Sequence, residues 1–299
     1  MKIIGYGCSH TAGGESVDHL VTGMTLEECV ETKKAFYSND NGKFFEWYAQ
    51  YMNPNNMDPE KRKYWYEDLI DEGTPGVFTN RIVQEELKNT WVRFLAEKME
   101  VEYKNRAKSG SCINRNVWNL LQDIKTGVVE KDDLIVFALP SMIRWCYWPE
   151  KYDIDLDVGE PETFILSFWL DPRNKYTKDI SKNTQQEVVE KMLTNTTLMW
   201  EYIKGLEILK GIAKTRGNLY CFVTDPLDVM RNPTTTQHKN LKKIFLDNLK
   251  EKHILPVSGL YDHDTYSGNW EATYGFGHPR IEHQKEFANK LYEAINNAS

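Results

Sequence analysis

The stretch KIIGYGCSHTAGG, residues 2–14, joins a short apolar run to a glycine-rich turn that carries a serine between a cysteine and a histidine. An apolar run that ends in glycines predicts a buried β-strand followed by a tight turn. A serine at the end of a strand is also a suitable place for a nucleophile, which needs a histidine base within hydrogen-bond distance. The stretch therefore has two interpretations, an ordinary turn or a turn that presents Ser9 as a nucleophile.

Further apolar runs alternate with helical patterns along the rest of the chain. This alternation predicts an α/β protein with a mainly parallel sheet of about five strands. Gly217 is predicted to stop a long helix, and Pro279 is predicted as the first residue of the last helix. The predicted strands are residues 2–7, 101–107, 133–140, 218–224 and 253–258, and the predicted helices are residues 79–99, 114–124, 184–217, 238–252 and 279–297.

Two segments interrupt the alternation, and both are rich in aromatic residues. We expect one domain over residues 1–299, with insertions at about 15–77 and 146–181. Each insertion leaves from the carboxyl end of a predicted strand, which is the edge where open α/β sheets bind ligands. The insertions are therefore candidates for a lid or a pocket wall, and oligomer contacts or surface decoration are the alternative.

Composition excludes several classes of protein. The chain has 299 residues, 40% of them hydrophobic, and a formal net charge of −7, which predicts a soluble globular protein with one substantial core. The mild acidity and the lack of a Lys/Arg stripe argue against a nucleic-acid partner. There is no apolar run long enough for a membrane span and no secretory signal at the N-terminus. The five widely spaced cysteines, with no CxxC pair, favour reduced thiols in a cytosol-type compartment.

Two further segments carry candidate catalytic groups. His278 lies in a loop between Gly277 and Pro279, directly before the last predicted helix, where a general base would be held but accessible. Gly110 follows the second predicted strand, and its N–H group would be able to donate to an oxyanion. The alternatives are a surface or capping histidine and an ordinary turn that caps the following helix.

Taken in order, these segments resemble the SGNH/GDSL hydrolase superfamily. A Gly-x-Ser follows the first strand, an Asn-x-Ala-x-x-Gly block follows the second, and a His-Pro precedes the last helix. The closing HPRIEHQKEFA is similar to versions from tailed bacteriophages. The resemblance implies a three-layer α/β/α sandwich with Ser9 as the nucleophile and His278 as the base. It also implies that the N–H groups of Ser9 and Gly110 contribute to the oxyanion hole.

The sequence departs from the family pattern at three positions. Cys8 stands where the family usually has an aspartate before the nucleophile, and it is interpreted as a small packed thiol. Pro140 stands where an asparagine usually completes the oxyanion hole. Arg144 is the preferred replacement because a cation there also stabilises an oxyanion, and Asn114 and Ser141 are alternatives.

The third departure concerns the acid that orients the histidine. The family places it three residues before the histidine, where this chain has Gly275. Asp262 and Asp264 are the candidate substitutes, with Glu271 or a backbone carbonyl as alternatives. A metal site in the same segment is not favoured, since no second His/Cys cluster completes it, and no metal or cofactor is expected.

The leading prediction is a serine esterase that acts on a small-molecule or carbohydrate ester. The aromatic insertions suit an O-acetylated glycan, and an acyl chain is the other candidate for the pocket. The main alternative is a hydrolase-fold protein that has lost catalysis and serves as a binding or structural component, such as part of a phage particle. Transfer of the acyl group to an acceptor other than water is a third possibility. The sequence does not indicate the oligomeric state.

Overall fold

The central sheet has four parallel strands in the order β4-β1-β5-β8 within the described residues of this computed structural model. The strands are β1 (Lys2–Tyr6), β4 (Glu102–Asn105), β5 (Leu134–Leu139) and β8 (Leu219–Val223). They confirm four of the predicted strands and the α/β fold class. The structure describes residues 1–37, 47, 49–70, 78–108, 111–140, 144–147, 162–165, 195–224, 236–257 and 278–298.

Of the fifth predicted strand, residues 253–258, the described residues 253–257 form a single parallel bridge, between Cys221 and Ile254. The N–H of Cys221 donates to the carbonyl of His253 at 2.8 Å, and the N–H of Leu255 donates back to the carbonyl of Cys221 at 2.7 Å. The next residue is Pro256, which has no N–H group to continue the ladder. The pairing therefore stops after one bridge.

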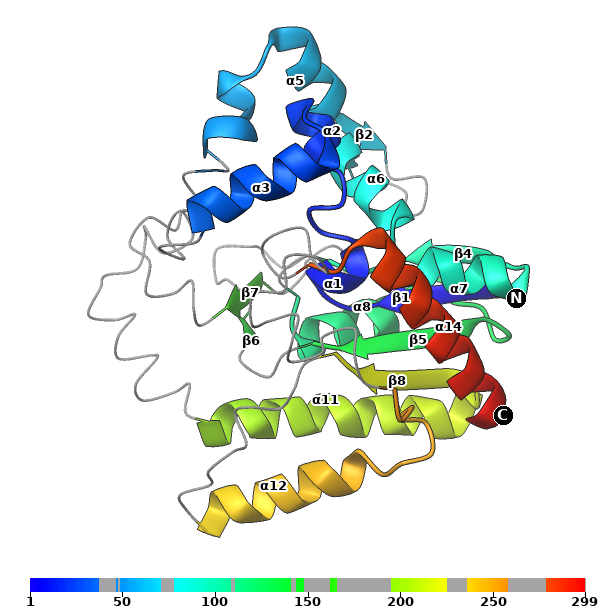
Figure 1. Ribbon diagram of the computed structural model, residues 1–299. Helices are drawn as coiled ribbons and strands as arrows, with labels where there is room; N and C mark the ends of the chain where they lie inside the picture. The colour runs from blue at the N-terminus through cyan, green and yellow to red at the C-terminus, as the bar shows by residue number, and fades with distance from the viewer. Residues whose placement is uncertain are drawn as a thin grey trace.

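Helices cover both faces of the sheet, so the sandwich has three layers (Figure 1). Alternate residues of each strand point to opposite faces, as in Ile3 and Ile4 of β1, which belong to different hydrophobic clusters. The helices on one face are α7 (Trp91–Met99) and α14 (Ile281–Ala298), and those on the other are α8 (Ile113–Lys125) and α11 (Asn195–Arg216), with α12 (Thr236–Asn248) packed on α11.

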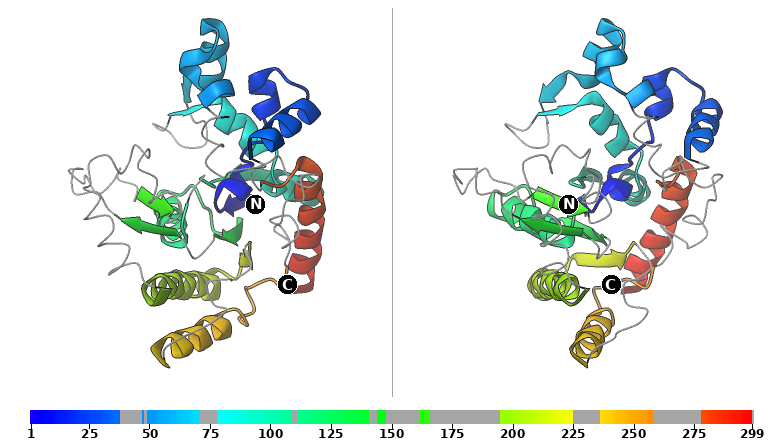
Figure 2. Two further views of the ribbon diagram at one scale, coloured as in Figure 1. Left: turned by 60° about the vertical axis from the view of Figure 1, so that its left-hand side comes forward. Right: turned by 90° about the vertical axis from the view of Figure 1, so that its left-hand side faces the viewer.

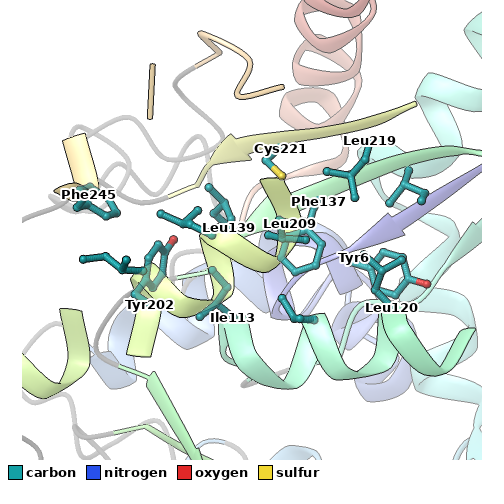
Figure 3. Close-up of a cluster of buried hydrophobic side chains, with 14 of the residues drawn as sticks. Tyr6, Ile113, Leu120, Phe137, Leu139, Tyr202, Leu209, Leu219, Cys221 and Phe245 are labelled. Carbon is teal, nitrogen blue, oxygen red and sulfur yellow. The ribbon is translucent and has the colours of Figure 1, made fainter. Parts of the chain in front are cut away.

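The face covered by α8 and α11 holds the cluster drawn in Figure 3. Tyr6 and Phe137, from neighbouring strands, stack with ring centroids 5.9 Å apart. Tyr202 of α11 and Phe245 of α12 extend the same cluster away from the sheet. Burial of these rings accounts for the position of α12, which covers α11 rather than the strands themselves.

One continuous helix was expected over residues 79–99, and that expectation is wrong. The segment forms two helices, α6 (Arg81–Lys88) and α7, separated at Asn89 and Thr90. Thr90 is extended, with φ −126° and ψ 159°, and its hydroxyl donates to the carbonyl of Leu87 at 3.1 Å. The apolar spacing runs through the break because both helices bury residues of that stripe.

The last helix also begins later than expected, because α14 starts at Ile281 rather than at Pro279. The carbonyl of Arg280 accepts from the N–H of Gln284 at 3.0 Å, so Arg280 caps the helix. Gly217 ends α11 as predicted, with a left-handed φ of 74°.

The segment after β1 forms a separate group of short elements, seen above the sandwich in Figure 1 and from other sides in Figure 2. Trp47 and Trp65 lie in its own small core, which reaches the rest of the molecule through Ile82 of α6. Its elements are α2 (Asp18–Thr22), α3 (Leu26–Tyr37), the 3-10 helix η1 (Pro54–Asn56), α5 (Pro59–Tyr66), β2 (Asp68–Ile70) and β3 (Phe78–Asn80). The short helix α1 (Ser9–Ala12) precedes this group and lies in the sandwich, near the end of β1 (Figure 1).

The described part of the second predicted insertion is an antiparallel pair of strands. These are β6 (Arg144–Tyr147) and β7 (Glu162–Ile165). None of the described helices is both long enough and apolar enough to span a membrane. The cysteines whose side chains the structure describes, Cys8, Cys29, Cys112 and Cys221, are buried and form no disulfide.

The contact between β1 and α7 depends on Gly5, since a Cβ there would lie 2.4 Å from Cγ2 of Val92. We expect Gly5→Ala to lower the free energy of unfolding by about 1–3 kcal/mol, because the methyl group overpacks a buried interface. Urea unfolding followed by circular dichroism measures the change. Gly211→Ala is the control, because a Cβ at this α11 position meets nothing within 4 Å. Equal stability of the two variants would contradict this account.

Candidate active site

Ser9 lies at the carboxyl edge of the sheet, as the first residue of α1 directly after β1. The carbonyl of Cys8 accepts from the N–H groups of Thr11 at 3.0 Å and Ala12 at 2.9 Å, which closes this turn. The side chains of Ser9 and His10 lie outside the described part of the structure. The structure therefore fixes where the backbone carries Ser9, at the end of a central strand.

The segment after β4 runs along the same edge. The N–H of Arg106 donates to the carbonyl of Gly5 at 2.8 Å, and that of Lys108 donates to Gly7 at 3.3 Å. This pairing extends β4 past Asn105 and carries the chain toward Gly110, which lies outside the described residues. Residues 106–108, which precede the predicted oxyanion donor, thus lie at the sheet edge beside residues 5–7.

Asn105 links three segments beneath this turn, a role that the sequence analysis did not assign. Its side-chain amide donates to the carbonyl of Thr11 at 2.7 Å and to the hydroxyl of Thr90 at 3.0 Å. Its side-chain oxygen accepts from the N–H of Ala107 at 3.1 Å. The break at Thr90 between α6 and α7 thus supplies one of the acceptors that hold the turn. In the sequence, the signal for this role is Asn105 itself, because it is the first residue of the Asn-x-Ala-x-x-Gly block.

His278 approaches the Ser9 turn from the other end of the chain. Its ring lies against Gly14, where a Cβ would be only 3.1 Å from Nε2. The side chain of His278 is 14% exposed, so the ring is held without being sealed from solvent. The two candidates that the sequence analysis named for nucleophile and base, Ser9 and His278, thus belong to neighbouring segments in space.

Glu15 is the acidic residue that the structure places behind His278. Its Oε2 lies 3.4 Å from Nδ1 of His278, and its backbone has a left-handed φ of 66°. Its N–H donates to Oε1 of Glu86 at 2.8 Å. The sequence analysis missed Glu15 because it was counted as the first residue of an insertion. The acids it named, Asp262, Asp264 and Glu271, lie outside the described residues and remain predictions.

A buried lysine joins Glu15 to the inserted helices. Nζ of Lys33, in α3, lies 2.6 Å from Oδ2 of Asp18 and 3.5 Å from Oε1 of Glu15. The ring of Trp47 lies 4.7 Å from the same ammonium, measured to its centroid. Burial alone would lower the pKa of Lys33, but the carboxylates of Asp18 and Glu15 raise it above its ordinary value. Lys33 is therefore a fully buried cation.

Two acids near Lys33, Asp18 and Glu86, have pKa values above the ordinary value. Burial raises the pKa of Asp18, and the charge of Glu15 adds to this effect, while Lys33 opposes it. Glu86 is partly exposed as a residue, yet burial of its carboxyl and the nearby Asp18 raise its pKa well above the ordinary value. Burial therefore favours the protonated form of Glu86. The carboxylates of Glu15 and Asp18 are the ones that contact Lys33.

Two candidate oxyanion donors are placed in part. The amide of Asn114, in the first turn of α8, donates to Oε2 of Glu201 at 3.2 Å. One of its two amide hydrogens is engaged there, so donation to a substrate would use the other. Arg144 begins β6, but its side chain lies outside the described part of the structure, as does Ser141. Both Arg144 and Asn114 remain predictions.

No protein-family model and no curated protein matches the chain in sequence. One similar solved structure is described as a carbohydrate esterase whose active site displays divergent catalytic and non-catalytic binding functions. It is 13% identical, with a TM-score of 0.41, and the alignment covers 99% of this chain. The chain spans 64% of the length of that structure. At this level of similarity the match gives no information on activity.

The raised pKa of Glu86 predicts how the stability of the protein depends on pH. The folded state holds this proton more tightly than the unfolded state, so the stabilisation is complete below the ordinary value of 4.5 and is lost as the pH rises through the folded-state pKa. Glu86→Gln keeps an acceptor for the N–H of Glu15 but does not titrate. We expect its unfolding free energy to decline less than that of the wild type as the pH rises above 4.5.

Urea unfolding at several pH values measures this slope. Glu85→Gln is the control, because the neighbouring Glu85 pairs with Lys88 on the exposed surface at 2.8 Å. It should leave the slope unchanged. A slope for Glu86→Gln equal to that of the wild type would show that Glu86 does not hold the extra proton.

Proposed function

We propose that the protein is a serine acyl hydrolase of the SGNH/GDSL type, with Ser9 as nucleophile and His278 as base. The observation that carries the proposal is the position of His278, whose ring packs on Gly14 in the segment that follows Ser9. Its Nδ1 faces the Glu15 carboxylate at 3.4 Å. A general base needs an acid at one ring nitrogen and the nucleophile at the other, and His278 has Glu15 at Nδ1 and Gly14, five residues after Ser9, at Nε2.

The reaction would proceed in two balanced steps. Oγ of Ser9 attacks the ester carbonyl while Nε2 of His278 takes the hydroxyl proton, and the alcohol then leaves with that proton as the C–O bond breaks. Water next attacks the acyl-serine, giving its proton to His278, and the acid product leaves as Ser9 recovers its hydroxyl proton. Glu15 would stabilise the imidazolium that forms in each step.

The oxyanion would be bound by the N–H groups of Ser9 and Gly110, with a third donor from Arg144 or Asn114. Support comes from the backbone pairing of Lys108 with Gly7, since each of them lies two residues before a proposed donor, Gly110 and Ser9 respectively. Preorganised donors of this kind commonly contribute on the order of 10²–10³ in rate each.

The proposed substrate is an ester of a carbohydrate, such as an O-acetylated glycan. Sugar rings stack on aromatic faces, and the inserted segments are rich in such residues. In the described part, Tyr64 of α5 is 54% exposed, with the guanidinium carbon of Arg81 4.1 Å from its ring centroid. A small ester with an acyl chain is the other substrate class consistent with the sequence.

A second candidate function is glycan binding, or a structural role in a larger particle, without turnover. The observation that favours it is at the end of β5, where Ala138 is buried and Pro140 has neither an N–H nor a side-chain donor. The carbonyl of Pro140 accepts from the hydroxyl of Tyr202 at 2.9 Å instead. The usual third donor of the family is therefore missing from this position.

A fluorophosphonate probe and a nitrophenyl acetate separate the two functions. We expect the folded wild type to label at Ser9 and to hydrolyse the ester, because His278 activates that hydroxyl. Ser9→Ala should abolish labelling, and His278→Ala should lower turnover by on the order of 10³-fold or more. The control is His283→Ala, on α14 near His278. A folded wild type that neither labels nor turns over, but still retains glycans, would support the binding role.

Gly14→Ala tests the contact with His278. The added methyl would lie 3.1 Å from Nε2, the nitrogen that has to reach Ser9. We expect kcat to fall by about 10- to 100-fold with little change in thermal stability, because a displacement below 1 Å misaligns the base. Circular dichroism confirms folding, and ester turnover measures the effect. Unchanged kcat would show that the Gly14 contact does not position the base.

A further inference from the structure

The carboxylate of Glu15 contacts two different groups with its two oxygens. Oε2 lies 3.4 Å from Nδ1 of His278, and Oε1 lies 3.5 Å from Nζ of Lys33. The Glu15 side chain is 7% exposed and the Lys33 side chain is fully buried. The lysine of an inserted helix is thus separated from the candidate base by one carboxylate.

A buried carboxylate in this position needs a cation. An isolated charge removed from water is costly, and the group normally takes up a proton instead. Asp18, 2.6 Å from Lys33, adds a second negative charge to the same small volume. Without Lys33, the two carboxylates would repel each other and one of them would protonate.

Three further titratable groups among the described residues lie near Lys33, and the pKa of each is shifted toward its uncharged form. Burial and the Lys33 charge lower the pKa of His19, and burial raises the pKa of the Cys29 thiol to about 11. Glu86 has a pKa well above its ordinary value because of burial and Asp18. Among the described groups, the ammonium of Lys33 therefore lies between two carboxylates, those of Glu15 and Asp18, and Glu15 also faces the imidazole ring.

We propose that Lys33 is a positioning residue of the site, which holds Glu15 ionised and in place against His278. The proposal rests on the proposed role of His278 as the base. The carboxylate of Glu15, held between Lys33 and the ring, would face the positive charge that His278 acquires when it takes a proton from Ser9. The helix α3 would then be part of the catalytic machinery, rather than only a lid or pocket wall.

Lys33→Met alone leaves Asp18 and Glu15 buried without a cation, so this variant is expected to unfold. The informative comparison is Asp18→Asn with the double variant Asp18→Asn/Lys33→Met. The first keeps Lys33 beside Glu15, and the second removes the lysine after its other partner has been neutralised. Lys34→Met is the surface control, because Lys34 is the next residue and its side chain is 45% exposed.

The first measurement is an NMR titration of the histidine imidazoles, with the His278 signal assigned by its loss in His278→Ala. We expect the His278–Glu15 pair to take up its first proton about one pH unit higher in the double variant than in Asp18→Asn. The reason is that loss of the cation leaves the site more negative. Lys34→Met should titrate like the wild type.

The second measurement is the pH profile of ester hydrolysis. Relative to Asp18→Asn, the double variant should lose about 10- to 100-fold in kcat, with KM nearly unchanged and the acid limb moved to higher pH. If Lys33 only supported the fold, its removal would change neither the acid limb of the pH profile nor the titration of the imidazole.

Identical titrations for Asp18→Asn and the double variant, both folded, would overturn the proposal. Ser9 labelling by fluorophosphonate would still stand in that case, so the proposed function would survive. A wild type that does not label would instead remove the proposed function, while the imidazole titration would still decide whether Lys33 controls the His278–Glu15 pair.

Discussion

The structure depends on the pairing of β1 with a strand on each side. Hydrogen bonds to β4 and β5 fix this strand in the middle of the sheet, and its register sets where the chain leaves the carboxyl edge. Ser9, Gly14 and Glu15 all follow within a few residues of that exit. Because β1 is buried on both faces, a shift in its register would displace all of these residues together.

Side chains from distant parts of the sequence stabilise the turn that follows β1. The side-chain amide of Asn105 donates to the carbonyl of Thr11 in this turn, and the C-terminal segment brings His278 against Gly14. Gln284, one turn into α14, accepts from the N–H of Trp91 at 3.0 Å and so caps α7. The segment that carries His278 is thereby anchored to the helix that packs on Gly5.

Local pattern was enough to predict most of the fold, and it failed where the cause was not local. Runs such as residues 133–140 predict strands because burial on both faces requires continuous apolar sequence. The break at Thr90 was hidden because the apolar spacing continues across it. For the site, family order indicated Ser9 and His278, which remain predictions. Glu15 depends on a backbone turn with positive φ and on a lysine from another helix, and neither leaves a periodic signal.

The distance in sequence between Ser9 and His278 has a consequence for biosynthesis. During translation the serine emerges early, but the histidine follows only after all of the described strands. Under the proposed function, a nascent chain would expose a hydroxyl that no base activates, and reactivity would begin only when α14 docks on α7. Synthesis of the last helix would then determine when the proposed site is complete.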